Sequence, residues 1–386
     1  MSKITKIITF SLAFILLVLT ACHKDAENTT IETDVQQFDA VWNELNDTYV
    51  FWGIDTTDWD AVYTKYHPIF EGMENEPYSV WSATWTELTS TLLDHHLTIK
   101  LNRLSDNSSL WLRPGYHEVM KRDYYHLGLG LDKRKNMMNR LVSSGKLLDT
   151  VSCYYNWKDQ NEKNHSAFFG SGILEQKIAY IYISSFSGLL LDTIEAFSHF
   201  KHLVAHENIK AAIIDVRDND GGAADNLVPL LSCFTTEPVL IGYTRTKLGL
   251  GKYDLSPKTS AIVNPISGQK REIPLIMLTN INSASMGEVA PIALMHLPQC
   301  YVVGERTFGA TGPAIDYLVT KEGKGYVITT AEWLFEDVDG SIYEGYGVEP
   351  DIKCLFEESL WNSGTDNQLE MAISVALDKI AENGNK

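Results

Sequence analysis

Apolar positions that repeat every three or four residues dominate the first quarter of the chain. One such series runs Val35, Phe38, Val41, Trp42, Leu45, Tyr49, and a second runs Trp81, Trp85, Leu88, Leu92. This spacing places the apolar side chains along one face of a helix. Together with a shorter segment at 59–70, the pattern predicts a small helical subdomain over residues 35–95, with its tryptophans in the core.

The pattern changes after residue 170, where short apolar runs alternate with amphipathic segments. Strands are predicted at 177–186, 209–216, 239–244, 274–279 and 301–304, and helices at 191–204, at 223–233 and from Ser285 onward. Strands that alternate with helices form crossover units in a mostly parallel sheet. A last amphipathic segment, 366–380, predicts a helix capped by Asp366. Residues 171–386 are therefore expected to form an α/β core domain.

The intervening segment, 96–170, is mixed and polar and gives the weakest pattern. Residues 96–101 alternate as a strand does, and a fainter alternation at 126–131 indicates another strand. Nothing in this segment repeats elsewhere in the chain.

Composition and charge narrow the class of protein. The 386 residues are 44% hydrophobic, enough for one large domain and a smaller one. The formal net charge is −18. Such an acidic balance excludes a general nucleic-acid binder, because no basic face is present to neutralise phosphates.

The N-terminus has the pattern of an export signal rather than of a folded domain. Lys3 and Lys6 precede an apolar run at 7–19, which is short for a membrane-spanning helix, and small residues lead to Cys22. The ending resembles a bacterial lipoprotein box. That resemblance implies a signal peptide at 1–21, a lipid on Cys22 and a polar tether over 22–34. The expected location is the cell envelope, anchored to a bacterial membrane. The outer membrane is the preferred expectation, with the protein facing the periplasm or the cell exterior. An ordinary signal peptide with a chance cysteine is the alternative.

Four further cysteines, Cys153, Cys233, Cys300 and Cys354, leave their redox state open. An exported compartment permits disulfides, and four cysteines allow three complete pairings, but buried free thiols fit equally. Their wide spacing lacks any paired zinc-ligand pattern. No metal and no cofactor are predicted.

The most informative chemistry lies around Ser285. The segment 282–288 (Asn-Ser-Ala-Ser-Met-Gly-Glu) follows the apolar run 274–279 and opens a helix. A hydroxyl at that position lies beside unpaired backbone N–H groups and the positive end of the helix dipole, which stabilise an oxyanion. Taken alone, the same pattern also fits a plain N-cap serine.

A second segment, 215–222 (Asp-Val-Arg-Asp-Asn-Asp-Gly-Gly), also joins a buried strand to a helix. Gly221 and Gly222 let backbone N–H groups approach a ligand closely. The chain has neither GxxxxGK[ST] nor GxGxxG, so nucleotide binding is disfavoured. A tight turn without function is the alternative.

Two histidines, His95 and His96, follow the helical part. Histidine is the commonest base for activating a serine, although a structural or surface pair is the alternative reading. A metal site is disfavoured because adjacent histidines point in divergent directions and no third ligand stands out nearby.

Two glycine-rich segments complete the set, 304–312 (Gly-Glu-Arg-Thr-Phe-Gly-Ala-Thr-Gly) and 344–351 (Glu-Gly-Tyr-Gly-Val-Glu-Pro-Asp). In this order, the five segments resemble the tail-specific or C-terminal processing serine protease superfamily, which includes the tricorn core. The resemblance covers about 94–351 through the elements DxRxNxGG, SASxxE, GExTxG and GVxPD. It implies a ClpP/crotonase-like α/β core without a cofactor.

Position by position, the resemblance implies Ser285 as the nucleophile. It also implies an oxyanion hole made by the backbone N–H of Met286 with that of Gly221 or Gly222. The bacterial processing branch carries a lysine base after GExTxG, but this chain has Ala310 there, 25 residues after Ser285. A serine without a base is a poor nucleophile.

The tricorn branch instead uses a histidine before the sheet and a late glutamate. His96 matches that histidine in a D-x-H pattern, and Glu344 falls near the glutamate, so a Ser285–His96 pair with Glu344 orienting the imidazole is expected. The tricorn pattern has a serine where this chain has His95. Glu288 is an alternative carboxylate, but one helical turn beyond Ser285 it is better placed to fix the start of the helix.

The resulting hypothesis is a lipid-anchored serine endopeptidase that acts on peptides or proteins. Residues 103–169 are short for a PDZ domain and no functional one is expected. The main alternative is an inactive peptide- or apolar-ligand-binding protein on the same fold. An α/β-hydrolase esterase is disfavoured because its elbow needs GxSxG. The oligomeric state and the peptide preference are not determined by the sequence.

Overall fold

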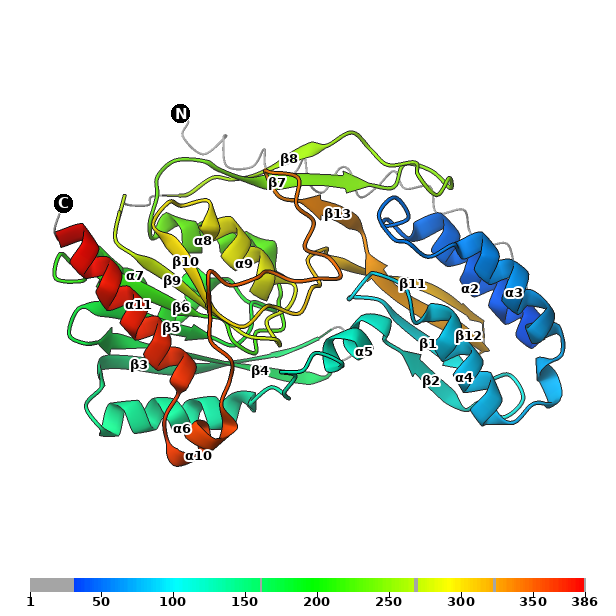
Figure 1. Ribbon diagram of the computed structural model, residues 1–386, viewed down its shortest axis with the longest axis horizontal. Helices are drawn as coiled ribbons and strands as arrows, with labels where there is room; N and C mark the ends of the chain where they lie inside the picture. Colours follow the sequence, from blue (N-terminus) through cyan, green and yellow to red (C-terminus); the bar gives the residue numbers. More distant parts are fainter. Residues whose placement is uncertain (1–30, 160–161, 267–269, 322–323, 385–386) are drawn as a thin grey trace.

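The computed structural model describes residues 31–384 except 160–161, 267–269 and 322–323 (Figure 1). The predicted signal peptide and Cys22 lie outside these residues. None of the helices within the described ranges is both long enough and apolar enough to cross a bilayer.

A seven-stranded sheet forms the centre of the larger unit, in the order β14-β10-β9-β6-β5-β4-β3. Its strands are β3 (Leu147–Lys158), β4 (Asn164–Leu174), β5 (Ile178–Ile183), β6 (Ala211–Asp215), β9 (Leu275–Thr279), β10 (Cys300–Gly304) and β14 (Ile352–Lys353). The strands from β5 to β14 are parallel, whereas β3 and β4 are antiparallel additions. The mostly parallel α/β core predicted from the alternation is therefore confirmed. Because β5, β6, β9 and β10 run the same way, the loops after them meet at one edge of the sheet.

Helices cover both faces of this sheet (Figure 1). One face packs against α7 (Glu195–Ala205), α8 (Leu227–Ser232) and α9 (Met286–Met295), preceded by the short 3-10 helices η2 (Leu191–Thr193) and η3 (Ala224–Asn226). The other packs against α6 (Gly130–Ser143) and α11 (Asn367–Gly384), with α10 (Glu358–Ser363) just before the last helix. Asp366 accepts a hydrogen bond from the Leu369 N–H, so the predicted cap of the last helix is confirmed.

The N-terminal helices form a second unit whose core includes residues from far along the chain. They are α2 (Asp34–Thr48), α3 (Trp59–Glu71), η1 (Met73–Asn75) and α4 (Tyr78–Thr89). Helix α2 begins at a capping box, in which Thr33 and Gln36 each bond the other's backbone N–H. The helices pack on an antiparallel sheet ordered β11 (Ala314–Lys321), β12 (Lys324–Ala331), β1 (Thr98–Asn102), β2 (Ser109–Leu112). The unit thus extends beyond the predicted 35–95.

The two units are also joined by a hairpin and a short helix. A third sheet, ordered β13 (Trp333–Glu336), β7 (Val239–Thr246), β8 (Thr259–Val263), lies above the core in Figure 1. In the connection between β7 and β8, Lys252 reaches the second unit and its Nζ lies 2.7 Å from Asp60 Oδ1. Helix α5 (Pro114–Met120) lies between the two units on the opposite side.

The structure decides two expectations from the sequence, one for residues 126–131 and one for the cysteines. The strand predicted at 126–131 is wrong, because residues 126–129 form a loop, 130–131 already belong to α6, and Leu127 is 71% exposed. An alternation of Leu and Gly without a partner strand does not make a strand. Among the residues that the structure describes, the cysteines Cys153, Cys233, Cys300 and Cys354 are all free thiols, which selects one of the alternatives that the sequence left open.

Candidate active site

Ser285 lies at a strained turn between β9 and α9. Its backbone has φ +54° and ψ −121°, a region that non-glycine residues rarely adopt and that is held only when the surroundings impose it. Two backbone hydrogen bonds impose it here, from Ala284 N–H to Asn219 O at 2.9 Å and from Ser285 N–H to Ala310 O at 2.8 Å. The half-buried side chain makes no capping hydrogen bond to α9. The plain N-cap alternative is therefore wrong, and the hydroxyl is left for other chemistry.

The glycine pair after β6 lies against this serine. Gly221 has φ +105°, and a Cβ added there would come 2.5 Å from Ser285 Cβ, 2.9 Å from Ser285 Oγ and 3.0 Å from the Met286 nitrogen. Only glycine permits this approach. The Gly221 N–H donates to Asn219 Oδ1 at 2.9 Å. Within the described part of the chain, the N–H groups of Gly222 and Met286 have no hydrogen-bond partner. Of the two predicted glycine donors, Gly222 is the unoccupied one.

The two histidines occupy a buried turn between the two units and differ in their bonding. His95 Nδ1 lies 2.9 Å from Phe308 O, and the His95 N–H donates to Glu344 Oε1. Burial lowers the pKa of His95 to about 4, although the Phe308 carbonyl opposes the shift, so the ring is neutral and structural. His96 has a buried Nδ1 without any hydrogen-bond partner among the described residues.

Glu344 is buried and anchors the loop that follows β10. Its Oε2 accepts hydrogen bonds from Thr311 N–H at 2.7 Å, Thr311 Oγ1 at 3.2 Å and Gly312 N–H at 3.2 Å. One ligand atom each from Asp94, His96 and Glu344 lie within 4.8 Å of one another. Such a trio could hold a metal ion, but N–H and O–H donors already bond the oxygens of both carboxylates. Burial, and then the charge of Asp94, raise the pKa of Glu344 well above its ordinary value.

Glu288 anchors the same loop from the side of α9. Its carboxylate accepts hydrogen bonds from Gly309 N–H at 2.8 Å, from Ala310 N–H at 2.7 Å and from the Thr307 hydroxyl. Complete burial raises its pKa to about 7 against these hydrogen bonds. The side chain thus fixes loop 307–310, and the prediction from the sequence that it fixes the start of its own helix is wrong.

Loop 307–312 connects the two halves of the site. It bonds Ser285 through Ala310 O and the histidine turn through Glu344 and Phe308 O. Ala310 itself is buried at the position of the absent lysine. The hydrogen bonds of the described residues include none between Ser285 and His96, and none between His96 and Glu344. Catalytic hydrogen bonds are often long without substrate and tighten in the complex.

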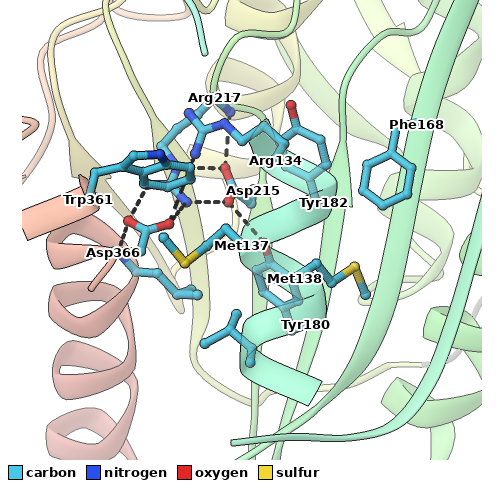
Figure 2. Close-up of a pocket in the computed structure, with 12 residues that line it drawn as sticks. Arg134, Met137, Met138, Phe168, Tyr180, Tyr182, Asp215, Arg217, Trp361 and Asp366 are labelled. Atoms are coloured by element: carbon cyan, nitrogen blue, oxygen red, sulfur yellow. Dashed lines mark hydrogen bonds and ion pairs between the residues drawn. The ribbon is translucent and has the colours of Figure 1, made fainter. Parts of the chain in front are cut away.

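The DxRxNxGG motif also supplies a second buried cluster, on the α6 and α11 side of the sheet (Figure 2). Arg217 bonds Asp215 and Asp366 at 2.7 Å each, and Arg134 bonds Asp218 at 2.8 Å. The cavity beside these residues measures only about 10 Å³, too little for a ligand. Arg134 and Asp366 carry no signal in the sequence that links them to the motif.

Comparison with known proteins finds a family that part of the chain resembles. Residues 177–354 match the model of peptidase family S41. A probable CtpA-like serine protease of Staphylococcus aureus (strain bovine RF122 / ET3-1) is 30% identical over 181 residues, which are 46% of this chain and 33% of that protein. The chain thus matches only about a third of the length of such relatives.

Solved structures show the same fold. A putative peptidase from Parabacteroides merdae superposes with a TM-score of 0.66 at 22% identity, covering 89% of this chain and 97% of that one. The tricorn protease gives 0.52 at 15% identity, covering 91% of this chain and 37% of that one. Residues 177–354 are therefore similar to peptidase family S41, in agreement with the resemblance of this segment to the C-terminal processing proteases.

Proposed function

We propose that the protein is a serine endopeptidase that cleaves peptide or protein substrates through Ser285, with His96 as its base. The observation that carries the proposal is the strained turn at Ser285, which frees the hydroxyl from helix capping and sets Ser285 against Gly221. The backbone N–H groups of the next residues, Gly222 and Met286, have no hydrogen-bond partner among the described residues. Strain of this kind persists only where surrounding contacts impose it, and it is common at catalytic serines.

The chemistry follows from the contacts. Ser285 Oγ attacks the scissile carbonyl carbon while the imidazole of His96 takes the hydroxyl proton. The N–H groups of Met286 and Gly222 then bind the oxyanion, and loss of one such donor costs about 3–4 kcal/mol of barrier. His96 returns the proton to the leaving amine, and water hydrolyses the acyl-enzyme by the same route. Burial lowers the pKa of His96, which keeps the ring unprotonated and able to act as a base.

Histidine rather than lysine is the proposed base because position 310 holds a small buried side chain without an amine. His96 is the histidine of choice within the turn, since the His95 ring is occupied by Phe308 O. These features support the tricorn-like branch of the resemblance.

Labelling with a fluorophosphonate probe tests the proposal. Wild type should be labelled and should cleave casein, whereas Ser285→Ala should lose both activities and His96→Ala should lose at least about 99% of its labelling rate. Ser187→Ala, another half-buried serine beside Gly221, and His117→Ala, an exposed histidine, are matched controls that should react as wild type does. Labelling that survives in Ser285→Ala would refute the assignment.

We further propose that Cys22 carries a lipid that anchors the enzyme to a bacterial membrane of the cell envelope. The support is the sequence pattern of residues 1–34 alone. Metabolic incorporation of an alkyne fatty acid into wild type, and its loss in Cys22→Ser, is the corresponding test. Incorporation that persists in Cys22→Ser would exclude this site.

A further inference from the structure

An exposed acidic residue stands directly beside the proposed oxyanion hole. Asp220 precedes Gly221, which lies against Ser285, and Gly222, whose N–H is a proposed oxyanion donor. The carboxyl group of Asp220 accepts a hydrogen bond from the Ser185 hydroxyl at 2.9 Å. Among the described residues, no Lys or Arg forms an ion pair with it. The site therefore places an unneutralised negative charge where the proposed reaction builds another.

This charge opposes the proposed reaction unless something offsets it. The oxyanion forms at the N–H of Gly222, and a negative charge two residues away raises its energy. Although Asp220 is exposed, desolvation around its carboxyl group raises its pKa, and the Ser185 hydroxyl opposes the shift. A cationic side chain of the substrate would offset both costs. It would do so most in the transition state, where the oxyanion charge develops.

We propose that Asp220 selects peptide substrates that carry a lysine or arginine side chain next to the scissile bond. The inference rests on the proposed function and adds the substrate class to it. It assigns Asp220 as a specificity-determining residue that touches the substrate side chain and not the reacting atoms.

An aromatic hollow adjoins the glycine pair. The rings of Trp157 on β3 and His165 on β4 stack with their centroids 5.3 Å apart, and both line a hollow of about 600 Å³. The Trp157 ring packs on Gly188, where an added Cβ would come 2.7 Å from it. The preceding residue, Ser187, donates from its hydroxyl to Gly221 O at 3.4 Å. Two consecutive residues therefore join the hollow to the glycine pair.

A carboxylate and an aromatic face together are suited to a cation. The indole ring of Trp157 offers its π face to an ammonium or guanidinium group. His165 lies within electrostatic reach of Asp220, but His165 and Lys158, which also lines the hollow, are each already paired with a neighbouring carboxylate. The formal net charge of −18 also attracts cationic peptides over a longer range.

The test uses paired peptides that carry either Lys or the uncharged Met at each position next to a bond that wild type cleaves. At one of these positions, wild type should show a kcat/KM about 10-fold higher for Lys. Asp220→Asn should lower this ratio to about 1 through a loss on the Lys peptide alone. A neutral fluorophosphonate should label Asp220→Asn at least as fast as wild type, which also shows that the variant is folded. The matched control is Asp225→Asn, which removes an exposed carboxylate three residues beyond Gly222 and should keep the preference for Lys.

Equal cleavage of the Lys and Met peptides by wild type, or a preference that Asp220→Asn retains, overturns the proposal. An equal loss in Asp225→Asn also overturns it, because the acidic surface as a whole would then account for the preference. Should Asp220→Asn fail to fold, Asp220→Ser takes its place.

A binding measurement separates this proposal from the proposed function. Fluorescence anisotropy of alanine-based peptides with one Lys or one Met needs no turnover and is made on Ser285→Ala. The Lys peptide should bind about 10-fold more tightly than the Met peptide, and adding Asp220→Asn should remove the difference. A wild type that no probe labels would contradict the serine peptidase, while the binding comparison would still decide whether Asp220 holds a cation. Equal binding of the two peptides would refute that role.

Discussion

Two buried clusters of charged side chains differ in whether an arginine forms ion pairs within them. The arginine cluster comprises Arg134, Asp215, Arg217 and Asp366, which Figure 2 shows, together with Asp218. The carboxylate cluster comprises Asp94, His96, Glu288 and Glu344. The sequence motifs contribute to both, so membership of a motif does not by itself mean catalysis.

The difference appears in how tightly each cluster holds its protons. Burial acts to raise the pKa of Asp218, but the charge of Arg134 and the hydrogen bonds from Asn280, Arg134 and the Leu129 N–H together outweigh it, and the pKa falls to about 2. Arg217 likewise outweighs burial and lowers the pKa of Asp366. In the carboxylate cluster burial outweighs the hydrogen bonds and the charge of Arg122, and the pKa of Glu288 rises to about 7. A cluster balanced by arginines stays ionised and holds structure, whereas an unbalanced one can exchange protons near neutral pH.

The largest expected effect comes from removing a cation from the balanced cluster. Arg217→Met leaves Asp215 and Asp366 buried without their partner, so the free energy of unfolding should fall by about 3–5 kcal/mol. Urea denaturation measures this change. The matched control is Lys146→Met, which breaks the exposed Lys146–Glu370 pair and should cost less than about 1 kcal/mol. A cost below about 1 kcal/mol for Arg217→Met would remove the basis of the comparison.

The sequence predicts the elements that form from local patterns, and it does not predict those that depend on pairing between distant segments. Strands β5, β6, β9 and β10 and their helices were predicted because buried parallel strands are continuous apolar runs. The pairing of β1 with β12 was not predicted, because the two strands are more than 200 residues apart and no local pattern encodes a partner. Strands β3 and β4 were not predicted either. Strand β3 is an edge strand with a largely exposed surface, so it lacks a continuous apolar run.

The residues of the two buried clusters and of the candidate site show the same difference between local and distant signals. Ser285 and the glycine pair were found through short segments in which the chain supplies both the turn and the group. Asp94 was read only as part of a D-x-H pattern, because its meeting with Glu344 depends on how the two units pack. The same holds for Arg134 and Asp366, which come from opposite ends of the core to meet Arg217. Charge balance is a tertiary property, and single segments do not display it.

The second expected effect is a pH dependence that belongs to the unbalanced cluster. The pKa of Glu288 is raised by burial from 4.5 to about 7, so the folded protein binds this proton more tightly than the unfolded chain. Its contribution to stability is therefore fully present below pH 4.5 and lost as pH rises through about 7, a change of roughly 3 kcal/mol. Glu288→Gln should remove this slope, so its stability relative to wild type should change by roughly 3 kcal/mol between pH 4.5 and 8.

Urea unfolding of both proteins between pH 4.5 and 8 provides the measurement. The difference in unfolding free energy between wild type and Glu288→Gln isolates the group from all other titrations. A difference that stays constant across this range would show that Glu288 is ionised throughout, as the carboxylates of the arginine cluster are. Glu370→Gln, an exposed carboxylate on α11, is the control without a slope.

The smallest expected effect comes from an intermediate case, in which the cation itself titrates. His126 Nε2 lies 3.0 Å from Oε2 of the buried Glu305, and His126 O accepts a hydrogen bond from Asn282, just before Ser285. Burial acts to lower the pKa of His126, but the bond to Glu305 outweighs it and raises the pKa. The stability from this pair is therefore fully present below the pKa of the unfolded chain, about 6.5, and is lost as pH rises through the folded value.

His126→Gln keeps a hydrogen-bond donor but cannot carry the charge, so it should cost about 1 kcal/mol at pH 6 and less at pH 8. Urea unfolding at the two pH values measures both costs. His165→Gln, in the more exposed His165–Asp159 pair, should cost less than about 0.5 kcal/mol at either pH. Equal costs for His126→Gln at pH 6 and pH 8 would mean that the pair is held by its hydrogen bond alone.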